Sequence, residues 1–77
     1  MKNEKDTEVV LSAHVIGRMA YRGITEENII DVLTRPDRTE KANHGYTAYI
    51  KKIGKRRLQV IAKKRGKKYY VLTAFPE

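Results

Sequence analysis

Apolar residues recur at a helical spacing in the first half of the chain and alternate with polar residues in the second half. The first helix is predicted over residues 13–22, because Ser12 can cap its start and Gly23 can end it. One side of this segment collects the apolar residues, which are Ala13, Val15, Ile16, Met19 and Ala20. We expect that side to pack against the core.

The opposite side of this predicted helix is basic. His14, Arg18 and Arg22 follow one another at intervals of four residues, and Tyr21 lies beside His14. One helix face is therefore expected to present an imidazole and two guanidinium groups.

A second helix is predicted between Thr25 and Pro36. The Thr25 hydroxyl can cap its start, two glutamates complement the positive end of its dipole, and Pro36 forces its end after residues 34–35. Its apolar side consists of Ile29, Ile30, Val32 and Leu33.

The remaining segments alternate like strands and are separated by glycine-containing turns. We expect a short edge strand at residues 9–11 and further strands at 38–42, 46–53, 56–64 and 68–75. Connections this short impose antiparallel neighbours on the later strands. The predicted fold is α+β, with two N-terminal helices packed on a three- to four-stranded antiparallel β-meander. It forms a single domain over residues 9–77, after a flexible tail at residues 1–8.

The composition narrows the chemistry. The 77 residues include no cysteine and only two histidines, which are far apart. We therefore expect no disulfide, no metal site and no cofactor. No apolar run is long enough to span a bilayer, and the N-terminal residues lack the apolar core of a signal peptide. We expect a cytoplasmic protein that does not bind membranes.

Charge is the most informative bulk property. Seventeen lysines and arginines against nine acidic residues give a net charge of +8. Residues 51–68 hold ten of the basic residues and no acidic one. Because a patch of one sign attracts polyanions, RNA or the ribosome is the expected partner. The alternative is the solvated surface of a lysine-rich protein.

The stretch Ser12-Ala13-His14-x-x-x-Arg18-Met19-x-x-Arg22-Gly23-Ile24-Thr25 resembles the opening motif of a family of small bacterial domains of unknown function. Members of that family read S/T-x-H-A-x-x-R-M-x-x-R-G-I, with Ala where this chain has Val15. The resemblance covers residues 9–75. The order of elements is similar to that of RelE-like and BrnT-like toxins, whose fold group includes barnase-like and colicin-type ribonucleases. The resemblance implies RNA cleavage that an antitoxin neutralises.

The candidate catalytic residues are His14, Arg18, Arg22 and Thr73. Metal-free RNA cleavage needs a group that transfers a proton and cations that neutralise the phosphorane. Because imidazole titrates near neutral pH, His14 is the candidate proton-transfer group. The arginines are candidates for binding successive phosphates. Alternatively, His14 is hydrogen-bonded within the fold, the arginines pair with carboxylates, and Thr73 is a packing residue.

The candidate nucleic-acid-binding residues are Lys51, Arg57, Lys63, Lys64, Arg65 and Tyr49. We expect Lys51, Arg57 and Lys63 on one sheet face, where they would form the floor of a groove. The alternative is a solvated sheet face with half-buried tyrosines. The sequence contains no Gly-rich phosphate loop, nucleophile elbow or carboxylate dyad.

Three functions remain open at this point. The first is a toxin-like RNA-binding domain that acts as a metal-independent endoribonuclease on mRNA or tRNA, with an acidic antitoxin as its partner. The second is a module that binds nucleic acid or the ribosome without cleaving it. The third is a protein-interaction domain whose basic surface binds an acidic partner.

Overall fold

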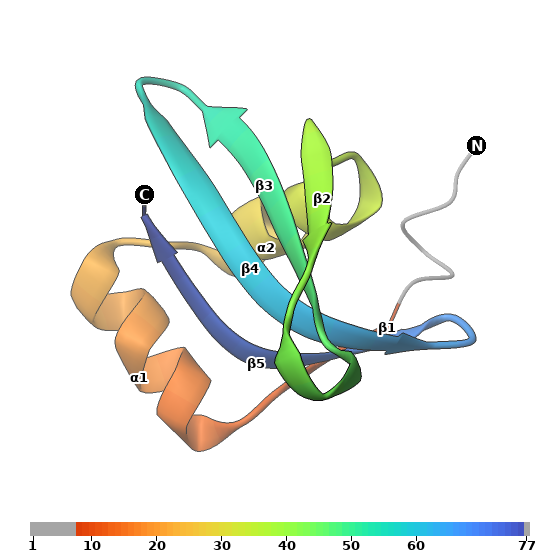
Figure 1. Cartoon of the computed structure of the whole chain (residues 1–77). Coiled ribbons are helices and arrows are strands. Elements are labelled where there is room, and N and C mark those ends of the chain that lie inside the picture. Colours follow the sequence, from red (N-terminus) through yellow and green to blue (C-terminus); the bar gives the residue numbers. More distant parts are fainter. Residues whose placement is uncertain (1–7, 77) are drawn as a thin grey trace.

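The computed structural model describes residues 8–76, which contain two α-helices and a five-stranded sheet (Figure 1). The helices are α1 (Ala13–Arg22) and α2 (Glu26–Thr34). The strands are β1 (Glu8–Leu11), β2 (Arg38–Lys41), β3 (Thr47–Ile53), β4 (Arg56–Arg65) and β5 (Lys68–Pro76), and a 3-10 turn, η2 (Asn43–Gly45), joins β2 to β3. The tail predicted at residues 1–8 lies outside the described residues, except for Glu8, which begins β1.

Local side-chain chemistry sets the ends of both helices as predicted. The Ser12 hydroxyl accepts a hydrogen bond from the backbone N–H of Val15 at 3.2 Å, and Gly23 ends α1 in the left-handed conformation with φ 68°. Thr25 and Asn28 form a reciprocal capping box at the start of α2. The predicted helices are confirmed.

The sheet differs from the prediction in one respect. Its strand order is β1-β5-β4-β3-β2, and β2 to β5 form the expected antiparallel meander. The fifth strand, β1, pairs in parallel with residues 68–71 of β5, so the sheet is mixed and the helices are not N-terminal to every strand. This pairing covers an otherwise open edge of β5 and brings Val9 and Leu11 against the core.

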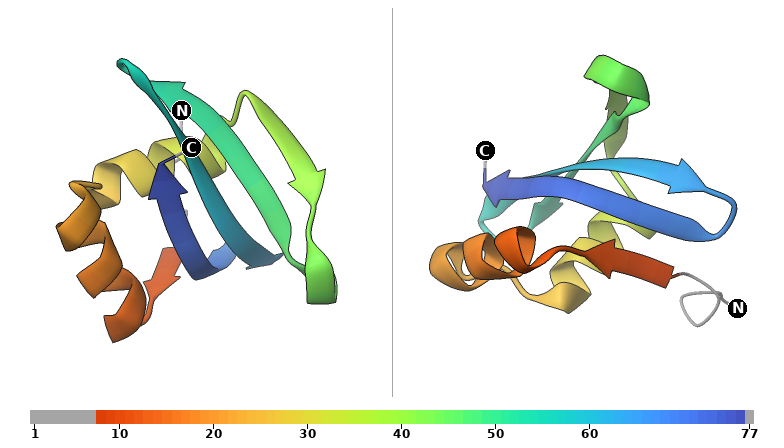
Figure 2. Two further views of the ribbon diagram at one scale, coloured as in Figure 1. Left: turned by 60° about the vertical axis from the view of Figure 1, so that its left-hand side comes forward. Right: turned by 90° about the horizontal axis from the view of Figure 1, so that it is seen from below.

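Both helices lie on the same side of the sheet (Figures 1 and 2), which we call the helix-bearing face. The core between the layers consists of Val15 and Met19 of α1, Ile29, Val32 and Leu33 of α2, and strand residues that include Leu58, Val60, Ala62, Val71 and Ala74. The predicted apolar side of α1 is too wide, because Ile16 is 53% exposed and Ala13 and Ala20 are exposed too. Only a narrow stripe of α1 touches β5 and β1.

We call the opposite side of the sheet the helix-free face. Ala48 and Ile50 of β3 point to this face, since their cross-strand partners there are Ile61 and Gln59. Both are nonetheless buried, at 4% and 2% exposed. No helix of the described residues covers this face, and the sheet is strongly bent here (Figure 2).

Candidate nucleic-acid interface

Cross-strand register decides which face each candidate residue occupies, because directly paired residues of antiparallel strands share a face. Arg57, Lys63 and Arg65 alternate with the core residues of β4 and therefore lie on the helix-free face. Lys51 pairs with Leu58, which is a core residue, so Lys51 lies on the helix-bearing face. The predicted common face for Lys51, Arg57 and Lys63 is wrong, since β3 and β4 pair one residue away from the register it needs.

Lys51 has a local structural role. Its Nζ donates a hydrogen bond to the carbonyl oxygen of Arg35 at 2.9 Å and lies 3.9 Å from Oδ1 of Asp37. The same carboxylate accepts a hydrogen bond from the backbone N–H of Lys52 at 2.9 Å. These contacts fasten the segment after α2 to β3 and occupy the Lys51 ammonium.

Tyr49 is also on the helix-bearing face, where it pairs with Val60. Its ring meets that of Tyr69 edge-on, with 5.8 Å between the centroids. Burial and the neighbouring Tyr69 raise the pKa of the Tyr49 hydroxyl, and a hydrogen bond with Thr47 opposes the shift. Tyr49 therefore contributes to packing in this arrangement.

Lys63 and Lys64 point to opposite faces. The Lys63 ammonium lies 4.7 Å from the centroid of the Tyr46 ring on the helix-free face, and the Lys64 ammonium lies 5.5 Å from the centroid of Tyr69. Both are cation–π contacts, which hold a lysine near an aromatic ring while leaving N–H groups able to bind an anion.

The ten basic residues of segment 51–68 do not form one patch. Those at the β3–β4 turn, here the Gly54 end, are Lys52, Lys55, Arg56 and Arg57. Those at the β4–β5 turn, here the Gly66 end, are Lys63, Lys64, Arg65, Lys67 and Lys68. The two turns are at opposite ends of the ten-residue β4 (Figure 1), about 30 Å apart at the rise of a β-strand.

No acidic residue occurs in the three central strands, β3, β4 and β5. On the helix-free face, the acidic residues of the described strands are Glu8 of β1 and Glu40 of β2, both at the sheet edges. The Glu40 carboxylate forms an ion pair with Arg38 at 3.3 Å. The positive charge of the two basic ends is thus not balanced by carboxylates along the middle of this face.

Strand β5 contributes apolar and aromatic residues to the helix-free face. Tyr70 pairs with Lys63 and is 40% exposed, and Thr73 pairs with Ile61. Leu72 is the extra residue of a bulge in β5 and is 51% exposed. The sequence favoured packing over base stacking for the strand tyrosines, but the position of Tyr70 one residue from the buried Tyr69 in an alternating strand places it on the other, exposed face.

The three candidate residues of α1 have different environments. Each four-residue step overshoots a full helical turn by about 40°, so Arg22 lies about 80° around the axis from His14. This drift turns Arg22 toward the sheet, where its Nη1 donates to the carbonyl oxygen of Ala74 at 2.8 Å. His14 and Arg18 are exposed, and within residues 8–76 no hydrogen bond or ion pair holds either side chain.

Arg56 connects the Gly54 end to α1. Its Nη1 donates to the carbonyl oxygen of Arg22 at 3.1 Å and its Nη2 to that of Gly23 at 2.9 Å. These two carbonyls are at the C-terminal, negative end of the helix, which a guanidinium stabilises. Among the predicted site residues, the structure brings Arg57, Lys63, Arg65 and Thr73 together on the helix-free face. His14 lies in the helix layer on the other side of the sheet, about 12 Å from Arg22 along the axis of α1.

The described part of the chain offers neither a metal site nor a membrane-spanning helix. Within residues 8–76 no three histidine, cysteine, aspartate or glutamate side chains are grouped so that they could hold a metal ion. No described helix has the length and apolarity needed to cross a membrane.

A family model described as a domain of unknown function (DUF4258) matches residues 11–76 of the chain. No curated protein and no solved structure matches it. The matched range includes both helices and all of β2 to β5.

Proposed function

The chain belongs to the DUF4258 family, and from this premise we propose that it is a toxin-like RNA-binding domain whose helix-free face binds a single strand of RNA. One observation carries the proposal: this face has arginines and lysines at both ends, an exposed aromatic ring opposite Lys63 at the Gly66 end, and no acidic residue on its central strands.

Electrostatics favours a polyanion on this face. Arg57 and Lys52 lie together at the Gly54 end, and Lys63 and Arg65 at the Gly66 end. Phosphates that bind lysines and arginines release condensed counterions, which is the main source of affinity in sequence-independent binding. Two positive ends with no carboxylate between them attract a chain of negative charges better than they attract a single anion.

The aromatic content favours a single strand over a duplex. Unpaired bases stack on exposed aromatic rings, and each such contact is worth about 1–3 kcal/mol. Tyr70 is exposed opposite Lys63 at the Gly66 end, and the Tyr46 ring lies beneath the Lys63 ammonium. The bases of a duplex are already stacked on one another and cannot use these rings.

The dimensions fit a short oligonucleotide. Arg57 and Lys63 are six residues apart on β4, a span of about 20 Å in an extended strand. Stacked nucleotides advance about 3.4 Å each along a strand, so about six of them cover this span. Proteins that bind single strands with one small domain have sites of about 4–16 nucleotides.

Metal-independent RNA cleavage at a separate site on α1, away from the helix-free face, is a second candidate function, supported by the exposed imidazole of His14 and the exposed guanidinium of Arg18. His14 would transfer a proton and Arg18 would bind a phosphate. The test is incubation with total tRNA and with translated mRNA, comparing the wild type with His14→Ala. Cleavage that disappears in the variant supports a ribonuclease, whereas binding without cleavage supports a binding module.

An acidic antitoxin is the partner that we propose for the same face. Its carboxylates would neutralise the two basic ends, and an apolar side chain would cover Leu72 and Tyr70, which are exposed on β5. Such a partner would compete with RNA, because both need Arg57 and Lys63.

The direct test of RNA binding is fluorescence anisotropy with a labelled eight-nucleotide single strand and a duplex of the same sequence. We expect the single strand to bind more tightly, with log K falling against log salt with a slope of about −2 to −3 for three to four neutralised phosphates. Equal binding of both forms would contradict a single-strand site. If the protein binds no RNA at low salt, the remaining candidate function is that of a protein-interaction domain for an acidic partner.

A further inference from the structure

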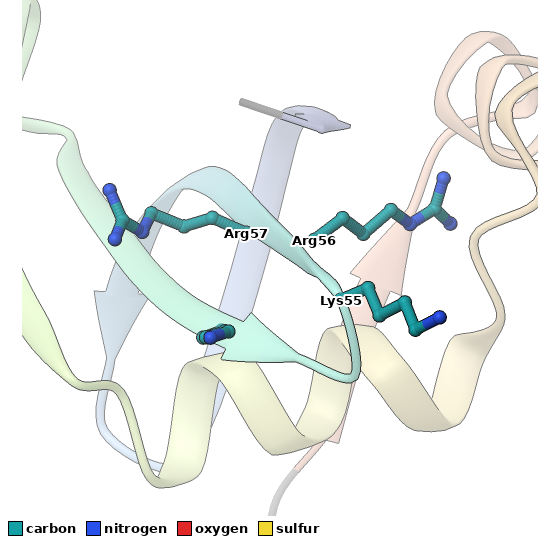
Figure 3. Close-up of a pocket in the computed structure, with 4 residues that line it drawn as sticks. Lys55, Arg56 and Arg57 are labelled. Atoms are coloured by element: carbon teal, nitrogen blue, oxygen red, sulfur yellow. The ribbon is translucent and has the colours of Figure 1, made fainter.

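The Gly54 end contains a pocket of about 400 Å³ lined by Lys52, Lys55, Arg56 and Arg57 (Figure 3). We propose that this pocket binds the phosphorylated end of an RNA strand, that is, a terminal phosphate monoester together with the adjoining diester. This inference rests on the proposed function and adds to it a preference for one kind of chain end.

The composition of the pocket points to an anion of high charge. Among residues 8–76, the side chains that line the pocket are all cations. Lys52 and Arg57 are direct cross-strand partners, a position in which like charges repel and destabilise a hairpin. A bound anion would weaken that repulsion, in addition to the interaction that Arg57 already makes.

One of the four cations is fixed before any ligand arrives. The two hydrogen bonds from Arg56 to the carbonyls of Arg22 and Gly23 hold its guanidinium at the end of α1. A guanidinium has five N–H donors, so donors beyond these two bonds are available to a phosphate. Because Arg56 is already ordered, binding through it costs little side-chain entropy.

The two lysines of the pocket, Lys52 and Lys55, have ammonium groups that are available to a ligand. Within the described residues, neither the Lys52 nor the Lys55 ammonium has a hydrogen bond or an ion pair, although Asp37 is near. Asp37 is occupied by the backbone N–H of Lys52 and by the ammonium of Lys51. Both free ammonium groups can therefore turn toward a ligand.

The directions of the side chains favour more than one phosphate. In Figure 3, Lys55 and Arg56 extend to one side of the hairpin, and Arg57 extends to the opposite side, over β3. The two sets of cations therefore present their charges on different sides of the hairpin. A terminal phosphate and the diester next to it provide anionic groups for both.

The position of the pocket favours a chain end over the middle of a chain. The pocket is at the tip of the β3–β4 hairpin, where the sheet ends (Figure 1). A strand of RNA that follows β4 from the Gly66 end reaches this tip last. A terminal phosphate carries a charge of about −1.5 to −2 near neutral pH, more than a diester, so a cluster of cations discriminates between them.

The experiment compares eight-nucleotide RNA strands that carry a 5′-phosphate, a 3′-phosphate or hydroxyl groups at both ends. The proteins are the wild type and two matched variants. Lys52→Ala/Lys55→Ala removes one strand lysine and one turn lysine from the pocket. Lys67→Ala/Lys68→Ala does the same at the Gly66 end, where Lys67 also follows a glycine in a turn.

We expect one phosphorylated end to tighten binding to the wild type by about fivefold to tenfold, the effect of adding one charge-assisted contact. The preference should vanish in Lys52→Ala/Lys55→Ala and remain in Lys67→Ala/Lys68→Ala. Equal affinity of the wild type for all three strands, with RNA binding intact, would overturn the inference and leave the proposed function standing.

A second arm separates the pocket from RNA binding. Pyrophosphate is titrated into the wild type while the amide signals of Gly54 and Lys55 are followed by NMR. Saturating shifts that disappear in Lys52→Ala/Lys55→Ala support a phosphate pocket, even if no RNA strand binds and the proposed function fails. Absence of saturation, together with no end preference, would overturn the pocket.

Discussion

The guanidinium of Arg22 lies 2.8 Å from the carbonyl oxygen of Ala74, 52 residues further along the chain. Ala74 is in the part of β5 beyond its pairing with β1, so this hydrogen bond satisfies a carbonyl at an otherwise open edge. The Arg22 side chain thereby joins α1 to the sheet, whatever else it does.

Arg22→Ala should lower the free energy of unfolding by about 1.5–3 kcal/mol, the range for hydrogen bonds made by charged groups. Arg18→Ala is the matched control, because Arg18 is exposed on the same helix, and it should change stability by less than about 0.5 kcal/mol. Urea unfolding measures both. Equal losses in the two variants would show that the contact with Ala74 contributes nothing.

Two glycines of the first helical region should respond in opposite directions to substitution by alanine. Gly23 has a φ of 68°, which costs a residue with a side chain about 1–2 kcal/mol. Gly17 is inside α1, and a Cβ added there would meet no atom within 4 Å. Gly23→Ala should therefore destabilise the fold, whereas Gly17→Ala should stabilise it by up to about 1 kcal/mol. Thermal unfolding tests both, and a destabilised Gly17→Ala would indicate a helix boundary different from that described.

The raised pKa of Tyr49 gives a prediction at alkaline pH. Burial favours the neutral hydroxyl in the folded state, so the unfolded chain loses this proton at a lower pH than the folded chain does. The contribution of this group to stability is complete below the ordinary tyrosine pKa of 10.0 and is lost as the pH rises above it. Tyr49→Phe should remove that part of the decline. The measurement is unfolding by urea at several alkaline pH values, with phenolate absorbance as a direct check; a Tyr49→Phe curve parallel to that of the wild type would contradict the assignment.

The sequence was sufficient for the elements whose ends depend on nearby residues. Ser12, Gly23 and Thr25 define helix ends through contacts within a few positions, so pattern and capping chemistry located α1 and α2. The parallel pairing of β1 with β5 joins segments about 60 residues apart, which no local pattern specifies. The meander was predictable because its connections are short.

The candidate interface was only partly predictable from the sequence, because it depends on how distant strands pair. Composition identified the basic segment, but the register that pairs Lys51 with Leu58 decides that Lys51 faces the helices. The length of β4 separates the basic residues into two ends, and the bulge at Leu72 changes the side-chain alternation of β5. Each of these features depends on strand pairing.

The most direct test of the account is whether RNA affinity depends on the face from which positive charge is removed. Arg57→Ala/Lys63→Ala removes two charges from the helix-free face. Lys41→Ala/Lys64→Ala removes two from the helix-bearing face, since Lys41 pairs with Thr47 and Lys64 with Tyr69. The measurement is the affinity for a single-stranded RNA as a function of salt. We predict that the negative slope of log K against log salt becomes shallower by about 1.4 in the first variant, as expected for two lost phosphate contacts. The second variant should keep the wild-type slope. Equal losses in both variants would contradict an RNA site on the helix-free face.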